Sequence, residues 1–252
     1  MTPARLEIIA LEDFPLVEPG DDIAQRLIDR APNGGYRDGD ILIIAQKIIS
    51  KAEGRFANLK CISPSKEAKA LASKTEKDPR LVELILSEST EIARHRPGVI
   101  IAVHRLGFVL ANAGIDASNV GKSDDHVLLL PVNPDQTCLD IRSTIHSETR
   151  AQVAIIINDS LGRAWRHGTM GIALGAAGLP ALVDLRQKLD LHGRTLQASI
   201  VGLADELAAA GSLVQGQGAE GRPVALVRGF DPFDRESPVS ELVRPASEDL
   251  FR

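Results

Sequence analysis

Aromatic residues and cysteines are scarce in this chain. Phe, Trp and Tyr make up 3% of its 252 residues, which leaves aliphatic side chains to build the core and argues against base stacking on exposed aromatic platforms. The two cysteines, Cys61 and Cys138, lie far apart and belong to no CxxC pair. Neither a disulfide framework nor a zinc cluster is therefore expected. Free thiols suit a reducing compartment, so we expect a cytoplasmic protein.

Long runs of basic or of apolar residues are also missing. The formal net charge is -5 and Lys and Arg form no block, which argues against nucleic acid as a partner. No apolar stretch is long enough to span a bilayer, and the acidic residues near the N-terminus do not suit a signal peptide, so no membrane association is expected. The remaining composition, 44% hydrophobic and 25% charged, is ordinary for a globular protein.

Short apolar runs predict the strands of the core. The segments 41–45 (ILIIA) and 153–157 (VAIII) are long enough and apolar enough for buried strands. Because strands and helices alternate without a regular rhythm, we expect the α/β class in its mixed α+β form rather than a barrel or a doubly wound sheet. Weaker patterns predict further strands at 6–11, 99–103, 108–111, 128–130, 194–201 and 224–227, helices at 22–30, 64–87, 139–149 and 203–210, a glycine-rich loop at 211–221, and a charged tail from about 236.

Two glycine motifs look like nucleotide-binding loops but fail on spacing or context. Gly121-Lys122-Ser123 resembles the end of a P-loop, yet Asp116 stands where the first glycine of that loop is required, and a carboxylate there would repel phosphate. The segment 216–221 matches GxGxxG, but it follows a helical pattern and precedes a strand, the reverse of a dinucleotide-binding fingerprint. Its glycines still allow backbone N–H groups to approach a phosphate.

Two aspartates follow predicted strands and are candidate metal ligands. Asp116 comes after the strand ending near Ala111, and Asp159 comes after 153–157. Together with the hydroxyl of Ser160 they offer the oxygen ligands that Mg²⁺ or Mn²⁺ prefers. Each aspartate could equally cap a helix or fix a turn, and the pair alone does not decide between these interpretations.

Basic residues follow the same strands. After 41–45 come Gln46, Lys47, Lys51 and Arg55. The lysines could neutralise phosphate, although solvated surface lysines are common. Arg163, Arg166 and His167 follow Asp159 and could hold an anionic substrate, because guanidinium groups fit carboxylates and phosphates; a solvated basic loop is the alternative.

Five segments together resemble the coenzyme F420-0:L-glutamate ligase family. They occur in the order of that family and span most of the chain, and the third is the most specific. The strings are 14–17 (FPLV), 46–55 (QKIISKAEGR), 112–120 (NAGIDASNV), 158–163 (NDSLGR) and 216–218 (GQG).

The resemblance implies a fold particular to this family, with one ligase unit over 1–252 made of two interleaved subdomains, in an intertwined homodimer. Some family members carry a second, flavin-binding domain, which is not expected in this chain. The resemblance further implies GTP as phosphoryl donor, Mg²⁺ or Mn²⁺ and K⁺ as ions, and F420-0 and L-glutamate as substrates.

The resemblance also assigns roles to residues. Metal ligands would be Asp116, Asp159, Ser160 and Gln217; at the last position the family can have a glutamate, and the neutral amide here leaves a second metal open. Lys51, Arg163 and Arg166 would act on the substrates. The nucleotide would contact Phe14, Pro15, Leu16, Val17, Gln46, Lys47, Lys51, Asn119, Gln215, Gly216, Gln217, Gly218, Ala219 and Glu220.

The expected function is therefore a GTP-dependent amide ligase that adds L-glutamate to F420-0 through an acyl phosphate. Three alternatives stay open at this point: a related ligase with another acceptor, a GTP-binding regulator without turnover, and a metal-dependent phosphohydrolase.

Overall fold

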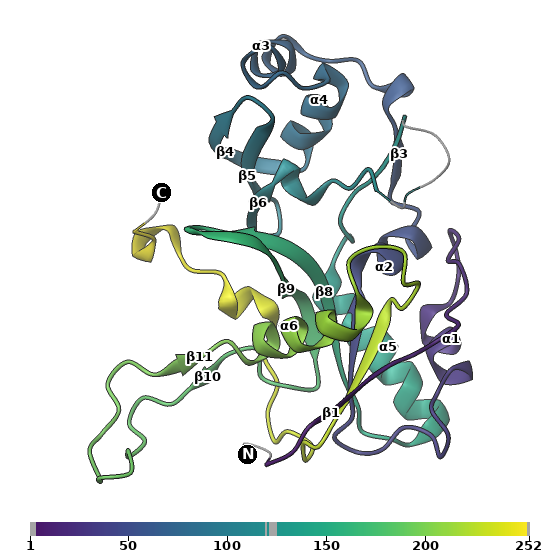
Figure 1. Ribbon diagram of the computed structural model, residues 1–252, viewed down its shortest axis with the longest axis vertical. Helices are drawn as coiled ribbons and strands as arrows, with labels where there is room; N and C mark the ends of the chain where they lie inside the picture. The colour runs from purple at the N-terminus through teal and green to yellow at the C-terminus, as the bar shows by residue number, and fades with distance from the viewer. Residues whose placement is uncertain (1–3, 119, 121–124, 251–252) are drawn as a thin grey trace.

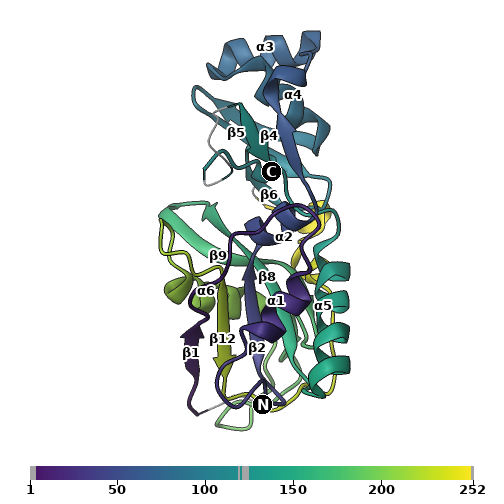
Figure 2. The same ribbon diagram turned by 90° about the vertical axis from the view of Figure 1, so that its right-hand side faces the viewer.

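The chain forms two lobes, stacked one above the other (Figures 1 and 2). The computed structural model describes residues 4–118, 120 and 125–250. The smaller lobe lies between residues 56 and 128, and the rest of the described chain forms the larger lobe. The chain passes into the smaller lobe after Ala52 and returns before α5 (Pro134–Thr149).

A five-stranded mixed sheet is the centre of the larger lobe. Only one neighbouring pair, β2 with β8, runs parallel; the other pairs are antiparallel. The strand order is β1 (Glu7–Ala10), β12 (Val224–Arg228), β2 (Ile41–Ala45), β8 (Ala154–Arg163) and β9 (Arg166–Ala177).

Helices cover both faces of this sheet, as the unbroken apolar run of β2 requires. Side chains alternate along a strand, so Ile41 and Ile43 pack on the side of α6, whereas Leu42 and Ile44 pack on the side of α1 and α5. Figure 2 shows α1 and α5 on one side of the sheet and α6 on the other. These helices are α1 (Ile23–Asp29), capped by Asp22, α5, capped by Asn133, and α6 (Leu203–Gln215).

The smaller lobe packs two helices on a three-stranded antiparallel sheet. Its core is built from small and aliphatic side chains such as Ala68, Ile85 and Ile100. The elements are α3 (Lys66–Thr75), α4 (Pro79–Ser87), β4 (Ser89–Arg96), β5 (Val99–His104) and β6 (Val109–Ala111), with a two-stranded ribbon of β3 (Phe56–Asn58) and β7 (His126–Leu128).

The remaining elements lie at the junction of the lobes and on an arm. The helix α2 (Gln46–Ala52) follows β2 directly and lies near the junction (Figure 1). The arm contains β10 (Val183–Asp184) and β11 (Ile200–Val201) and projects away from the larger lobe (Figure 1). Short 3₁₀ helices are found at Leu59–Cys61, Asn112–Gly114, Val239–Leu242 and Ala246–Glu248.

Glycines in β9 allow two helices to approach the sheet closely. A Cβ atom at Gly171 would lie 2.4 Å from the carbonyl oxygen of Ala208 in α6, and one at Gly175 would lie 2.4 Å from the carbonyl carbon of Pro134 in α5. Both distances are well inside van der Waals contact. The glycine-rich composition of this segment is thus a packing requirement of β9, the edge strand that both helices contact.

The mixed α/β class and most predicted elements are confirmed. The main errors concern lengths: β8 does not end at Ile157 but continues to Arg163 as one arm of a hairpin with β9, so that Asp159 lies within a strand and not after it. The strands β4 and β9 and the helix α2 were not predicted, because their sequences lack a clear apolar alternation. The strand expected at 194–201 is limited to Ile200–Val201, that at 128–130 lies at His126–Leu128, and the helix at 139–149 begins at Pro134.

No helix in the described part of the chain has the length and apolar character needed to cross a membrane.

The close contact between β9 and α6 gives a stability prediction. Gly171→Ala forces a methyl group against the backbone of α6 and is expected to destabilise the protein by about 1–3 kcal/mol. Gly162→Ala is the matched control, because a Cβ atom there meets nothing within 4 Å. Urea unfolding followed by circular dichroism measures both; equal midpoints for the two variants would contradict the packing argument.

Candidate active site

The parallel pairing of β2 with β8 brings the end of β2 beside the middle of β8, where the apolar run of that strand ends. In this register Ala45, the last residue of β2, lies opposite Asn158 of β8. The next residues are Gln46 and Lys47 on one chain segment and Asp159 and Ser160 on the other. Polar groups that follow the two apolar runs therefore meet at the same edge of the sheet, directly below the smaller lobe.

Asp116 reaches this edge from the smaller lobe. Its backbone forms an isolated β-bridge with Leu128. Its Oδ2 accepts a hydrogen bond from Gln46 Nε2 at 3.1 Å and lies 3.3 Å from Lys47 Nζ. Gln46 is itself oriented by the hydroxyl of Ser50, which donates to Gln46 Oε1 at 2.9 Å. Residues at the start of α2 thus hold Asp116 beside Asp159.

The two carboxyl groups share a site that is short of positive charge. Burial and the nearby charge of Asp116 raise the pKa of Asp159 to about 6, although the N–H of Ser160 and the charge of Lys47 oppose the shift. Burial also raises the pKa of Asp116, against the effect of Lys47 and Gln46. Two half-buried carboxylates that repel one another favour a cation between them.

The donor atoms here fit a hard divalent cation. Oxygen donors surround the site: the two carboxylates, the hydroxyl of Ser160 and the amide oxygen of Gln217, to which Ser160 Oγ donates at 2.7 Å. Among the described residues no group of three or more His, Cys, Asp or Glu side chains is found. Mg²⁺ usually binds one or two carboxylates together with water and phosphate oxygens, so the pair suits a metal that arrives with a phosphorylated ligand.

A cavity of about 650 Å³ extends from the carboxylate pair over α2 and the glycine-rich loop; we call it the lysine cavity, after Lys47 and Lys51 on its wall. Lys51 on its wall is half-buried, and burial together with the charge of Lys47 lowers its pKa. The residues predicted for metal or nucleotide that line it are Phe14, Pro15, Leu16, Val17, Gln46, Lys47, Lys51, Asp116, Asp159, Ser160, Gln215, Gly216, Gln217, Gly218, Ala219 and Glu220.

The loop 216–221 is anchored to the sheet by Gln215. This buried side chain accepts a hydrogen bond from Asn158 Nδ2 at 2.8 Å and donates to the carbonyl oxygen of Ile43 at 3.0 Å. The carboxylate of Glu220 accepts from the N–H of Gly218 at 2.8 Å. Hydrogen bonds from its own backbone N–H and from that of Gly218 lower the pKa of Glu220. Gln215 therefore acts on the loop as an anchor, and the loop offers backbone N–H groups to an anion.

A second cavity, of about 920 Å³, lies on the other side of the carboxylate pair, between β4–β6 and the β8–β9 hairpin; we call it the inter-lobe cavity. Its walls are largely apolar, with Ile101, Val109, Leu161 and Met170 among them. The two cavities share Asp116, Asp159, Ser160 and Thr169.

The arginines predicted to act on substrate have different surroundings. Arg163, at the end of β8, lines the inter-lobe cavity and donates to the carbonyl oxygen of Gly168 at 3.3 Å. Arg166 is exposed at the start of β9, as is His167. Arg55, which follows the two lysines in the sequence, instead binds Glu88 at the lobe junction. Asn119, predicted to contact nucleotide, lies outside the described residues.

Comparisons with known proteins identify the family of this chain. The family described as F420-0:Gamma-glutamyl ligase matches residues 13–229. Three relatives named Coenzyme F420:L-glutamate ligase are 45% identical (Methanothermobacter thermautotrophicus), 41% identical (Methanopyrus kandleri) and 39% identical (Haloarcula marismortui). In each case 98% of this chain is covered, with 99%, 99% and 96% of the relative.

The chain belongs to the F420-0:gamma-glutamyl ligase family. This confirms the resemblance seen in the five sequence segments, and the expectation of an enzyme of the ligase class is confirmed by the same relatives.

Sequence reasoning missed two residues that line the cavities of this candidate site. Thr169 lines both cavities, and Arg94 lines the inter-lobe cavity. Both lie in strands that were not predicted, β9 and β4. The signal that was available is the hairpin itself, because pairing of β8 with β9 places Thr169 opposite Gly162, next to the segment 158–163.

The raised pKa of Asp159 predicts that the metal-free ligase loses folding stability as the pH rises. Its folded pKa of about 6 exceeds the ordinary value of 3.8, so the stability contributed by the protonated form is complete below pH 3.8 and is lost as pH rises through about 6. Asp159→Asn removes this loss and should stabilise the protein at pH 8 by about 2 kcal/mol, allowing for partial solvent exposure.

Thermal unfolding at pH 5 and pH 8 without divalent metal measures this effect. The gain should be larger at pH 8, while the exposed Asp29→Asn should change neither value. An Asp159→Asn variant no more stable than the parent at pH 8 would show that the carboxylate pair is not strained.

Proposed function

We propose that the chain adds L-glutamate to F420-0 at the expense of GTP, through an acyl phosphate, and releases GDP and phosphate. The observation that carries this proposal is the meeting of two cavities at one carboxylate pair. A phosphoryl transfer between two large substrates needs such an arrangement, because donor and acceptor must approach the same point from different sides.

The nucleotide occupies the lysine cavity. Lys47 and Lys51 supply positive charge beside the carboxylate pair, and the loop 216–221 supplies backbone N–H groups. The segment 14–17 forms the distant wall, where a base can lie against apolar side chains. GTP binding would displace the Glu220 carboxylate from the N–H of Gly218, since both are anions.

The acceptor and L-glutamate occupy the inter-lobe cavity. Its apolar walls suit a flat ring system, and Arg94 and Arg163 suit the anionic groups of an acceptor that carries phosphate and carboxylate. Arg163 lines this cavity and Arg166 does not, so we assign the anion contact to Arg163.

The reaction then proceeds in two displacements. A carboxylate oxygen of F420-0 attacks the γ-phosphorus, the bond from that phosphorus to the bridging oxygen breaks, and GDP leaves. The α-ammonium group of L-glutamate loses one proton to solvent, and the resulting amine attacks the acyl carbon. The bond from that carbon to the phosphate oxygen breaks, and phosphate leaves with the second proton of the nitrogen as the amide forms. Lys47 and Lys51 offset the charge on the phosphates, and the surrounding walls limit hydrolysis of the acyl phosphate.

Divalent metal belongs to this proposal. Asp116 and Asp159 would hold Mg²⁺ or Mn²⁺, with Ser160 and Gln217 nearby, and the ion would neutralise developing charge on the phosphates. A K⁺ ion, implied by the family resemblance, stays a prediction without assigned ligands.

A homodimer is proposed on the basis of the arm. Leu189 and Leu191 on the arm are 66% and 101% exposed, and apolar side chains on a projecting segment suit contact with a second copy. The interleaved subdomains and the cytoplasmic location stay predictions.

The function is tested by incubating purified protein with GTP, F420-0, L-glutamate and Mn²⁺. GDP should form only with both other substrates, and mass spectrometry should detect the glutamylated product. Product from a different acceptor indicates a related ligase, GTP binding without turnover indicates a regulator, and phosphate release without acceptor indicates a phosphohydrolase. Each of these results contradicts the proposal.

Asp116→Asn tests the role of the carboxylate pair. Because it removes one of two anionic ligands, it should lower kcat by at least about 100-fold. Asp29→Asn, an exposed carboxylate on α1, is the control. Turnover of Asp116→Asn equal to that of the control would exclude the metal role of Asp116.

Gln217→Glu tests whether the amide limits metal binding. A carboxylate can still accept the hydrogen bond from Ser160 and adds a negative charge, so Mn²⁺ should bind about five- to tenfold more tightly. Gln197→Glu makes the same change of net charge on the exposed arm and should have no effect. Isothermal titration with Mn²⁺ compares the two; equal affinities would remove Gln217 from the metal site.

A further inference from the structure

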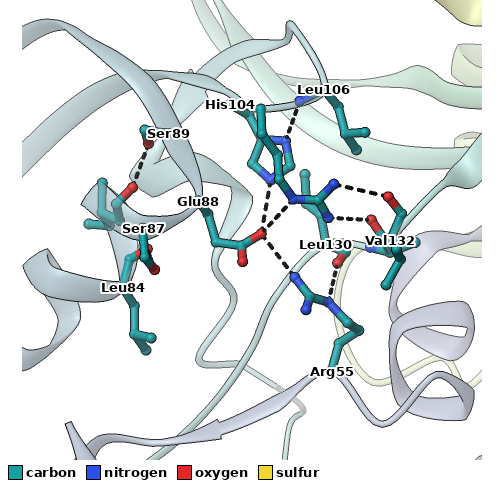
Figure 3. Close-up of polar contacts among 12 residues, drawn as sticks. Arg55, Leu84, Ser87, Glu88, Ser89, His104, Leu106, Leu130 and Val132 are labelled. Carbon is teal, nitrogen blue, oxygen red and sulfur yellow. Dashed lines mark hydrogen bonds and ion pairs between the residues drawn. The ribbon is translucent and has the colours of Figure 1, made fainter.

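A charged cluster at the junction of the lobes is used by none of the steps above. Its centre is Glu88, which directly follows α4. Glu88 Oε2 accepts hydrogen bonds from Arg55 Nη2 at 2.9 Å and from Arg105 Nε at 3.2 Å. His104 Nε2 lies 3.4 Å from the same oxygen. Figure 3 shows Arg55 and His104 converging on Glu88.

Glu88 is ionised and His104 is neutral in this cluster. Burial opposes ionisation of Glu88, whose side chain is 13% exposed, but Arg55 and Arg105 outweigh it and its pKa is lowered. Burial and the charge of Arg105 lower the pKa of His104 to about 4. Because His104 Nδ1 accepts from the N–H of Leu106, its proton is on Nε2 and faces Glu88.

Both arginines also hold the chain segment that returns from the smaller lobe. Arg55 Nε donates to the carbonyl oxygen of Leu130 at 2.9 Å. Arg105 donates to the carbonyl oxygens of Val132 at 3.0 Å and Pro131 at 3.2 Å. Arg55 lies on the segment that leads into the smaller lobe, and Arg105 lies in that lobe. The carboxylate of Glu88 therefore orients two side chains that join the outgoing and returning segments to the smaller lobe.

A short series of backbone contacts connects this segment to the candidate metal site. The N–H of Leu129 donates to the carbonyl oxygen of Arg55 at 3.0 Å. The preceding residue, Leu128, exchanges two backbone hydrogen bonds with Asp116, at 2.9 and 2.8 Å. The arginines therefore hold residues 130–132 only two positions beyond the bridge that places Asp116.

We propose that Glu88 is a positioning residue of the active site. Glu88 holds Arg55 and Arg105 on the carbonyl groups of 130–132 and so fixes the segment that bridges to Asp116. This segment in turn sets where the Asp116 carboxylate lies relative to Asp159 of the larger lobe. The inference rests on the proposed function only where it concerns turnover; the placement of Asp116 is a property of the chain itself.

If Glu88 positions Asp116, its loss should affect metal binding and turnover but not nucleotide affinity, a difference that general destabilisation would not give. Lys47, Lys51 and the glycine-rich loop belong to the larger lobe, so nucleotide affinity should survive loss of Glu88. Metal binding and phosphoryl transfer depend on Asp116 and should be weakened by the loss of Glu88. Substitutions of residues that orient a metal ligand typically cost about 10–100-fold in affinity or activity.

The experiment compares Glu88→Gln with Glu83→Gln in the full chain. Glu83 lies in α4, shortly before Glu88. Its carboxylate accepts from the N–H of Ser65, away from the segments that join the lobes. Glu88→Gln should weaken Mn²⁺ binding, measured with the metal alone, by about tenfold, and lower kcat by about tenfold with the KM for GTP within about twofold. Hydrogen exchange should rise at the amides of Leu128, Leu129 and Asp116. Glu83→Gln should show none of these changes.

Arg105→Lys is the second variant in case Glu88→Gln fails to fold. It keeps the charge but cannot reach two carbonyl groups and Glu88 together, so the same changes should appear at smaller size. Unchanged Mn²⁺ affinity and unchanged exchange at Leu128 and Asp116 in a folded variant would overturn the proposal. If the parent protein makes no glutamylated product, the proposed function fails, whereas Mn²⁺ binding and exchange still test the role of Glu88.

Discussion

The parallel pairing of β2 with β8 is the constraint on which the site depends. The apolar runs of these two strands, which lie side by side in one direction, end at the same edge of the sheet, and the residues after both runs are polar. Gln46 and Lys47 start a helix at this edge, while β8 continues past it and carries Asp159 and Ser160 onward. If this pair were antiparallel, the lysines and the carboxylate would lie at opposite ends of the sheet.

The same edge concentrates negative charge that the metal-free fold does not fully compensate. Lys47 is the nearby cation for Asp116, and burial raises the pKa of both carboxyl groups. Such a site lowers stability and is retained where binding requires it. The sheet offsets this cost because helices cover both of its faces, with Ile43 fully buried on one face and Ile44 on the other.

Apolar patterns predicted the central strands and the segments that carry the site, because buried strands leave a strong and local signal. They did not predict β4 or β9. In β9 the alternation is hidden by glycines such as Gly171 and Gly175, which are small because α6 and α5 lie against them, and contacts with distant helices leave no local pattern. For the same reason Thr169 was missed, and Arg55 was grouped with the lysines although its partner is Glu88, 33 positions later.

The two carboxylates come from different lobes, so their separation depends on how the lobes are arranged. The position of Asp159 is fixed by the sheet. The position of Asp116 depends on its bridge to Leu128 and on the segment after Leu128 that returns to the larger lobe. A displacement of the smaller lobe would change the separation of the carboxylates and the width of the inter-lobe cavity together, because β6 and Asp116 both line that cavity. An acceptor bound between the lobes would therefore also act on the metal site, so that acceptor binding and metal binding are expected to be coupled.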